Sequence, residues 1–379
     1  MTHYLAKGAP QYLYEHFVAN SECDVELVEH PLTDDTDSYT KISCHPIQQV
    51  DRESTVKLKY GYLSHLFFNI FFLNRKNNCL LVFGVNPLNF LSAYLAKKLG
   101  CINNDAKLIY YSIDFSPERF KNRYANWVYH WIERFSWSKA DKVWDVSPMI
   151  NRARTEHPVL LGLRRGNVDS PLVVPIGVER ILTRADSARG SGALRLGFVG
   201  HLLEKQGLGL VLSALRQHVS RHEPEYFELD IIGGGGCEKE LKNFVSDNQL
   251  DGYVKFHGWI HSRKDIEDIL RKCDVGLAMY NPATVGFTRY ADPTKLKDYL
   301  AVGLPIVMTA TTYNSSDLFE VGCAFEAKFN VDDFLRVLRT LAQKPSVLRA
   351  AHQAIPEVVG SLTWTKIFSD AIRDLANEK

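Results

Sequence analysis

The sequence lacks paired cysteines and any excess of charge of one sign. Its seven cysteines are scattered singly, and this odd number without a CxxC pair argues against a disulfide framework or a zinc site and favours a reducing compartment. Lys and Arg total 45 against 44 for Asp and Glu, so no overall field favours a nucleic-acid partner. With 45% hydrophobic and 23% charged residues, the composition excludes a mainly disordered or coiled-coil chain.

Long hydrophobic runs are also absent. The first residues show neither the basic nor the apolar region of a signal peptide. The longest apolar run, Tyr62–Leu73, is too short to span a bilayer and is interrupted by His65 and Asn69. We therefore expect a cytoplasmic chain, either soluble or peripheral on the inner face of the cytoplasmic membrane.

Short apolar runs alternate with amphipathic segments along the whole chain. Strands are expected at residues 80–83, 107–113, 142–146, 172–175, 196–199, 228–232, 254–256, 275–279 and 306–309. Helices are expected at residues 11–19, 87–99, 119–138, 208–218, 238–247, 265–272, 295–301 and 331–343. Strands separated by helices indicate parallel βαβ units, so the fold class is α/β with two doubly wound, Rossmann-like domains in tandem.

A stretch rich in Gly, Ser, Ala and Arg at 183–194 is typical of a linker or domain-entry loop. We divide the chain into an N-terminal domain (1–175), a C-terminal domain (176–355) and a terminal helix (356–379) that is a candidate to pack back on the first domain. Doubly wound sheets bind ligands at the carboxyl ends of their strands, which predicts a cleft between the domains. A glycine loop at 7–10 has only six residues before it, so either the first strand is very short or the chain begins late.

Two glycine loops follow expected strands in the C-terminal half. Gly200 and His201 come after strand 196–199, and Lys205 and Gln206 lie just before the next helix. Such a loop lets backbone N–H groups reach a phosphate, although an ordinary βα turn has the same pattern. The second loop, residues 233–236, has four glycines, more than a turn requires, which indicates close backbone approach to a ligand or else a flexible loop.

The most informative stretch is residues 292–305 (DPTKLKDYLAVGLP). Pro293 stands where a helix can begin, which puts Thr294 and Lys295 in the first turn, where they can grip a diphosphate. Asp298 lies one turn later on the same face and can accept hydrogen bonds from a ribose diol. The alternative is a Lys–Asp pair on a helix surface.

These motifs, in this order and with the segment 255–259 (KFHGW), resemble the donor-binding half of the GT-B glycosyltransferases, specifically the group 1 (family-4-like) enzymes of bacterial polysaccharide biosynthesis. The resemblance covers roughly residues 173 to 305. It implies two Rossmann-like domains that face each other across a cleft. It also implies a transferase that takes a nucleotide-diphosphate sugar and needs neither metal nor cofactor, because helix N-termini and Lys295 neutralise the leaving diphosphate.

The resemblance also implies roles for individual residues. Lys295 and Thr294 would hold the diphosphate, Asp298 the ribose, and the loop at Gly258 and Trp259 would flank the base. The other implied donor-binding residues are Gly200, His201, Lys205, Gln206, Gly233, Gly234, Gly235 and Tyr280. Two departures leave the sugar and the stereochemistry open. Tyr290 stands where many members have the first Glu of their Glu-x7-Glu motif, and His201 and Gln206 stand where many have Arg and Lys.

The N-terminal half resembles the family only loosely. Asp114 follows strand 107–113, and a carboxylate there can take the proton of an acceptor hydroxyl. This placement is similar to that of the base of the xanthan-type glucuronosyltransferase, which inverts. The alternative is that Asp114, or its rival Ser116, caps the next helix. The candidate acceptor-binding residues are Lys7, Gly8, Gln11 and Arg119.

Two further features have competing interpretations. Asp34, Asp35 and Asp37 form a DxD-like string in a polar loop, which we interpret as a solvated acidic turn and not as a metal site. The run Tyr62–Leu73, followed by Arg75 and Lys76, and the segment 124–137 are aromatic with basic flanks. Each fits contact with a membrane surface or burial in the first domain.

We therefore predict a glycosyltransferase that moves a sugar from a nucleotide-diphosphate sugar to a lipid-linked or polysaccharide acceptor. A catalytically silent partner subunit and a sugar-nucleotide epimerase of the same fold remain alternatives. The expected partners are the donor, the acceptor and a membrane surface, with no nucleic acid.

Overall fold

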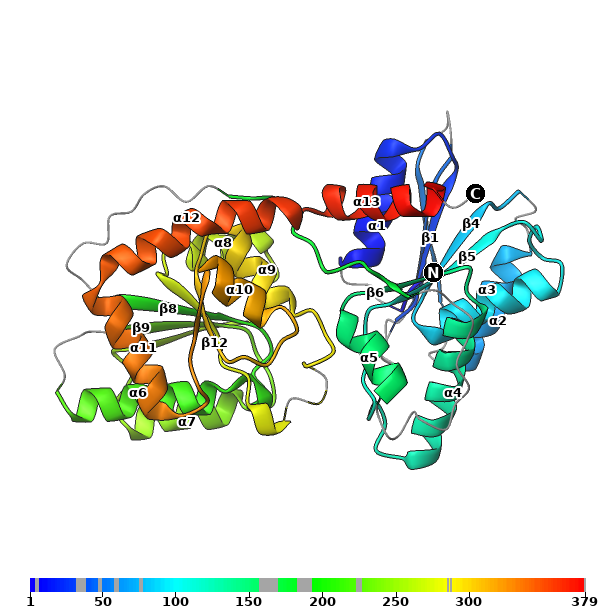
Figure 1. Cartoon of the computed structure of the whole chain (residues 1–379). Coiled ribbons are helices and arrows are strands. Elements are labelled where there is room, and N and C mark those ends of the chain that lie inside the picture. Colours follow the sequence, from blue (N-terminus) through cyan, green and yellow to red (C-terminus); the bar gives the residue numbers. More distant parts are fainter. Residues whose placement is uncertain are drawn as a thin grey trace. The chain divides into compact units, whose positions relative to one another are not determined.

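The computed structural model of the protein describes residues 1–3, 7–31, 39–46, 50–57, 61–74, 78–156, 170–182, 193–222, 227–284, 286 and 288–377. The chain divides into two compact units (Figure 1). The N-terminal unit comprises Met1–Gly177 with Trp364–Lys379, and the C-terminal unit comprises Val178–Thr363. Each unit contains a parallel sheet with helices, so the predicted α/β class is confirmed. Most of the linker at 183–194, the acidic string at 34–37 and the basic pair at 75–76 lie outside the described residues.

The C-terminal unit is built on a six-stranded parallel sheet in the order β10-β9-β8-β11-β12-β13. The strands are β8 (Leu194–Val199), β9 (Phe227–Ile232), β10 (Val254–Gly258), β11 (Val275–Ala278), β12 (Ile306–Met308) and β13 (Ala324–Glu326). The chain builds outward from β8 to β10 and then returns to β11 on the other side of β8. Ligands of doubly wound sheets bind at such a reversal, at the carboxyl ends of the strands.

Two hydrophobic clusters cover the two faces of this sheet. One cluster receives residues from α6 (Leu208–Ser220), α7 (Glu238–Asp247) and α11 (Val331–Gln343). The other receives residues from α8 (Arg263–Leu270), α9 (Thr294–Ala301), α10 (Ser315–Val321) and α12 (Pro345–Ser361). Along β8, Leu196 and Phe198 enter the first cluster and Val199 the second, because successive side chains of a strand point to opposite faces.

The N-terminal unit has a four-stranded parallel sheet in the order β4-β5-β6-β7 and a three-stranded antiparallel sheet β1-β2-β3 that the sequence did not predict. The strands are β1 (Val25–Glu29), β2 (Thr40–His45), β3 (Arg52–Val56), β4 (Leu81–Val85), β5 (Lys107–Ser112), β6 (Lys142–Asp145) and β7 (Leu172–Val173). The helices are α1 (Ala9–Asn20), α2 (Tyr62–Leu73), α3 (Pro87–Lys98), α4 (Arg123–Lys139), α5 (Pro148–Glu156) and α13 (Trp364–Asn377). No helix within the described residues is long and apolar enough to cross a bilayer.

A very short N-terminal segment joins the two sheets of this unit. The Thr2 N–H donates to the Val28 carbonyl and the His30 N–H donates to the Thr2 carbonyl, both at 2.9 Å. On the other side the Val85 N–H donates to the Met1 carbonyl at 3.0 Å. Thr2 thus forms a single parallel bridge with Glu29, and within the described residues no strand precedes α1.

Two helices differ from their predicted extents. The helix expected at 119–138 begins at Arg123, because the Asn122 side chain accepts hydrogen bonds from the N–H groups of Tyr124 (2.9 Å) and Ala125 (3.1 Å). The interpretation of Asp114 or Ser116 as the cap of this helix is therefore wrong. The terminal segment forms two helices, α12 and α13, and in α13 the Trp364 ring stacks on the Tyr12 ring of α1 at 5.0 Å. The units divide after residues 177 and 363, where the sequence placed boundaries at 175 and 355.

Candidate functional site

The loops that follow β8 and β9 pack against each other, backbone to backbone. The Gly200 N–H donates to the Ile232 carbonyl at 3.0 Å, and the Leu202 N–H donates to the Gly234 carbonyl at 2.9 Å. A Cβ atom on Gly233 would lie 2.0 Å from the Gly200 carbonyl oxygen, and one on Gly235 would lie 2.7 Å from that of Leu202. This loop–loop contact by itself requires glycine at 233 and 235. The φ angles of these residues, 134° and 154°, also favour glycine.

Lys295 lies at the carboxyl end of β8, beside the first of these loops. It is in the first turn of α9, and only 6% of it is exposed. Its Nζ donates to Gln206 Oε1 at 2.6 Å and lies 3.9 Å from the centroid of the Phe198 ring. A Cβ atom on Gly200 would be 3.4 Å from the same Nζ. Lys295, Gln206 and Gly200, which are far apart in the sequence, thus form one cluster.

Burial changes the acid–base behaviour of Lys295. Removal from water disfavours the ammonium form and lowers the pKa of Lys295 to about 7, a shift that Asp298 opposes and Lys205 reinforces. An arriving anion would favour the protonated form. The cluster is therefore suited to bind a phosphate group together with a proton.

Residues of α9 itself hold the helix in this position. The Tyr299 hydroxyl accepts a hydrogen bond from the Val199 N–H (3.2 Å) and donates to the Leu277 carbonyl (2.9 Å). This ties α9 to the ends of β8 and β11. In addition, buried Lys297 donates to Asp292 Oδ1 at 2.8 Å, just before the helix begins. The first turn of α9 is thus fixed at the reversal of the strand order.

Asp298 is held by a residue that the sequence analysis missed. Its Oδ1 lies 2.7 Å from Nη1 of Arg263, at the start of α8. Arg263 Nε also donates to Glu267 at 3.1 Å, and Glu267 is in turn bound by Arg180. Burial raises the pKa of Asp298, and Arg263 opposes this shift. Lys295 and Asp298 are therefore engaged by other partners and are not a surface pair of their own.

Other predicted residues line the same edge of the sheet. Gly258 ends β10 with φ 69°, and the next residue, Trp259, is 54% exposed. The Trp259 ring lies 5.0 Å from the His201 ring, and a Cβ on Gly234 would be 3.9 Å from an atom of the Trp259 ring. Three further candidates lie at this edge. Tyr280 is buried, with its ring 5.3 Å from Lys295 Nζ, and Thr294 is exposed at the start of α9. The Lys205 carbonyl accepts a hydrogen bond from the Asn281 N–H at 3.1 Å.

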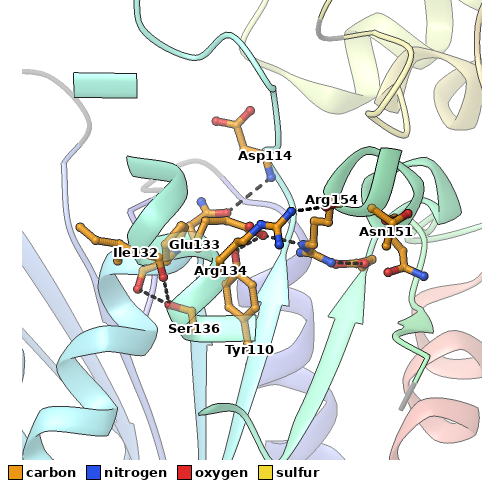
Figure 2. Close-up of polar contacts among 12 residues, drawn as sticks. Tyr110, Asp114, Ile132, Glu133, Arg134, Ser136, Asn151 and Arg154 are labelled. Carbon is orange, nitrogen blue, oxygen red and sulfur yellow. Dashed lines mark hydrogen bonds and ion pairs between the residues drawn. The ribbon is translucent and has the colours of Figure 1, made fainter. Parts of the chain in front are cut away.

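Asp114 belongs to the N-terminal unit, where it follows β5. Its Oδ2 lies 2.8 Å from Arg119 Nη1, which also donates to the Asp114 carbonyl at 3.0 Å. About a quarter (25%) of the Asp114 side chain is exposed. Figure 2 shows its carboxylate turned away from the buried polar network behind it. The group is thus a partly exposed carboxylate at a strand end with one oxygen engaged by Arg119.

The buried network behind Asp114 is an ion-pair cluster that the sequence did not predict (Figure 2). Arg154 of α5 forms two hydrogen bonds with Asp145 of β6 (2.7 and 3.0 Å), and its Nε donates to Glu133 of α4 at 2.6 Å. All three side chains are at most 1% exposed. Burial raises the pKa of Asp145 to about 6, which Arg154 opposes. The cluster joins α4 and α5 to the sheet.

The candidate acceptor-binding residues at the N-terminus have structural contacts. Lys7 pairs with Glu15 at 3.0 Å. The Gly8 N–H donates to Gln11 Oε1 (3.0 Å), and Gln11 Nε2 donates to Glu29 (2.7 Å). These bonds set the start of α1, and Arg119 is the acceptor candidate that contacts Asp114. A role of these residues with an acceptor stays a prediction. Within the described residues, no three His, Cys, Asp or Glu side chains are arranged to hold a metal ion.

Comparisons with known proteins agree with this geometry. Residues 193–344 match the family described as Glycosyl transferases group 1. The amylovoran biosynthesis glycosyltransferase AmsK of Erwinia amylovora is 34% identical over 114 residues, which are 30% of this chain and 27% of AmsK. The chain thus spans only about a quarter of that relative.

Solved structures extend the likeness to most of the chain. Anabaena HepE in complex with UDP has a TM-score of 0.64 at 16% identity and covers 83% of both chains. The lipopolysaccharide outer core galactosyltransferase WaaB has a TM-score of 0.56 at 14% identity, with 83% of this chain and 80% of WaaB covered. The fold is therefore that of the GT-B glycosyltransferases, with two Rossmann-like domains. Within this fold, residues 193–344 match the group 1 glycosyltransferases, and this agrees with the resemblance carried by the motifs of the C-terminal half.

Proposed function

We propose that this protein transfers a sugar from a nucleotide-diphosphate sugar to a lipid-linked or glycan acceptor, and that no metal takes part. The observation that carries the proposal is the buried ammonium of Lys295 beside Gly200 and Gln206, at the first turn of α9. A helix N-terminus and a desolvated cation are both favourable for the charge of a leaving diphosphate. The match of residues 193–344 to the group 1 glycosyltransferase family supports the same assignment.

In this proposal, different residues bind different parts of the donor. Lys295 and the first-turn N–H groups of α9 bind the diphosphate. Asp298 accepts a hydrogen bond from a ribose hydroxyl with the oxygen that does not face Arg263, and the exposed Trp259 ring stacks on the base. Asp114, in the other unit, takes the proton of the acceptor hydroxyl as a general base. We propose a uridine nucleotide as the donor, because HepE, with which the chain shares its fold, binds UDP.

Calorimetric titration with UDP, GDP and dTDP tests the donor site, and release of nucleoside diphosphate from the matching sugar donors in a membrane extract tests the transfer. We expect one nucleotide to bind, with loss of binding in Lys295→Ala and retention in Lys344→Ala, a change of an exposed lysine in the same unit. Absence of binding by all three would contradict the proposal. Binding without turnover would favour the silent partner subunit, and conversion of the free sugar nucleotide without transfer would favour an epimerase.

A further inference from the structure

Helix α2 has the reverse of the usual arrangement of polar and apolar side chains. A surface helix normally buries its apolar face and exposes its polar one. In α2 the polar His65 and Asn69 are buried, whereas Phe67 is 67% and Phe71 59% exposed, together with Leu63. Leu63, Phe67 and Phe71 follow one another at intervals of four residues, so they form a single stripe.

The buried polar side fixes α2 in this rotation. His30 Nε2 hydrogen bonds to Asn69 Oδ1 at 2.9 Å, and Asn69 Nδ2 donates to Asn89 Oδ1 at 3.1 Å. The His65 ring stacks on the His30 ring at 4.4 Å. Burial lowers the pKa of His30 to about 3 and also lowers that of His65, so both rings are neutral at physiological pH. Turning α2 to bury its phenylalanines would break these bonds and leave polar groups unsatisfied, so the exposed apolar stripe is a built feature.

The neighbouring helices extend this stripe into a larger surface. Helix α3 packs against both α2 and α4 (Figure 1). Helix α4 exposes Trp127 (59%) and Trp131 (49%), and Leu99 is exposed just after α3. We name this surface the three-helix face. It consists of Leu63, Phe67, Phe71, Leu99, Tyr124, Trp127, Val128 and Trp131.

Within α2, α3 and α4, the charged side chains that are not buried all have one sign. Helix α2 carries none, and the charged residues of α3 are Lys97 and Lys98. In α4 the side chains of Glu133 and Arg134 are both buried, so the exposed charged residues of this helix are the basic ones at its two ends. The exposed or half-exposed charged side chains of the three helices are Lys97, Lys98, Arg123 and Lys139. Apolar and aromatic side chains bordered by basic ones match the interface of a bilayer that contains anionic lipid.

We propose that the three-helix face docks the N-terminal unit on an anionic lipid bilayer. Leu63, Phe67 and Phe71 enter the boundary between headgroups and acyl chains. The tryptophans of α4 lie at headgroup level, and the lysines and arginine contact lipid phosphates. This inference goes beyond sugar transfer and does not depend on the donor site, because all its residues belong to the N-terminal unit. The other conceivable occupant is a second copy of the chain.

The full chain is tested by sedimentation with vesicles of phosphatidylcholine alone or mixed with phosphatidylglycerol, at low and high salt. We expect binding to the anionic vesicles at low salt, weakened by salt, and a partition coefficient lowered at least about tenfold by Phe67→Ser/Phe71→Ser. Val321→Ser, which changes an exposed apolar residue of the C-terminal unit, is the matched control and should bind as the wild type does. Circular dichroism and thermal unfolding show that each variant is folded.

Tryptophan fluorescence locates the contact. The emission should shift to the blue on binding, and Trp127→Phe/Trp131→Phe should keep the binding but lose most of the shift. Wild-type protein that ignores anionic vesicles, or Phe67→Ser/Phe71→Ser protein that binds them normally, would overturn the proposal. A wild-type dimer that Phe67→Ser/Phe71→Ser dissociates, without vesicle binding, would assign the face to a second copy instead.

Discussion

Lys295 is almost fully buried, and among the described residues no carboxylate lies within hydrogen-bonding distance of its ammonium group. A lysine in such surroundings is costly to bury, which makes Lys295 informative. We expect Lys295→Ala to weaken UDP binding by about 1.5–3 kcal/mol, roughly 10- to 150-fold, because a charge-assisted contact to phosphate is lost. Uridine binding should change little. Titration calorimetry with both ligands, with Lys344→Ala as control, measures the difference. Equal losses for UDP and uridine would remove Lys295 from the diphosphate site.

The same residue makes this prediction dependent on pH. The pKa of Lys295, about 7 in the folded protein, is below its value of 10.5 in the unfolded chain. Between these values the unfolded state binds more protons, so burial of Lys295 destabilises the fold least at high pH. UDP favours the ammonium form, so its affinity should fall as pH rises above about 7, and binding should take up a proton. Calorimetry in buffers of different ionisation enthalpy detects this uptake, which Lys295→Ala should lack.

Asp298 allows the ribose contact to be separated from the phosphate contact. We expect Asp298→Ala to weaken UDP binding while pyrophosphate binding is unchanged, because the proposed partner of this carboxylate is a ribose hydroxyl, which pyrophosphate lacks. Its partner Arg263 is half-exposed at 45%, so the pair itself contributes little to stability. Glu320→Ala, an exposed carboxylate in α10, is the control. If Asp298→Ala binds both ligands as the wild type does, Asp298 serves only to anchor Arg263.

Ion pairs that hold elements together differ widely in strength. Helix α5 contains one arginine in a buried ion-pair cluster and another in an exposed ion pair. Arg154 is buried between Asp145 and Glu133, whereas Arg152 pairs with Glu156 on the surface with 61% of its side chain exposed. We expect Arg154→Met to lower the free energy of unfolding by about 3–5 kcal/mol, because two buried carboxylates lose their cation. Arg152→Met should change the free energy of unfolding far less, because its ion pair is exposed to solvent. Urea denaturation measures both.

This loss should also depend on pH. The pKa of Asp145 is already about 6 because of burial, and removal of Arg154 would raise it further. A raised carboxyl pKa means that the folded state binds more protons than the unfolded state, so stability falls as pH rises past 4. The destabilisation by Arg154→Met should therefore be largest above about pH 6 and smaller in acid. A loss that does not change with pH would mean that packing, not charge, dominates.

Strongly periodic elements were predictable from the sequence, and those defined by distant partners were not. The bounds of α7 and α11 agree with the prediction, because their apolar residues recur at helical spacing. The strand β3 (RESTV) is exposed along its whole length and gives no such signal. In the site, the first turn of α9 was recognisable from Pro293 to Lys295. Arg263 and the Arg154 cluster were not, because nothing near them in the sequence indicates the partners that folding brings to them.

Across the whole molecule the proposed roles are separated by unit. The donor residues all belong to the C-terminal unit, and Asp114 belongs to the N-terminal unit. A change at Asp114 should therefore affect transfer without affecting donor affinity. Asp114 has two conceivable roles, as the general base or as the partner of Arg119 in an ion pair. A carboxylate with a purely structural role would serve only the ion pair.

We expect Asp114→Asn to reduce transfer by about 10²–10⁴-fold with normal UDP affinity, because Asn keeps the shape of Asp but cannot accept a proton. The pair with Arg119 is partly exposed, so its loss should lower the free energy of unfolding by no more than about 1 kcal/mol. Arg119→Gln breaks the same pair and leaves the carboxylate. At saturating acceptor, where the predicted role of Arg119 in acceptor binding no longer limits the rate, it should retain far more turnover. Turnover, donor affinity and unfolding are measured on the same preparations. If Asp114→Asn and Arg119→Gln lose activity equally, or Asp114→Asn transfers sugar normally, Asp114 is not the base.

If transfer inverts the anomeric configuration of the donor, the base assignment gains support. A retaining reaction needs no base on that face and would leave Asp114 to orient the acceptor.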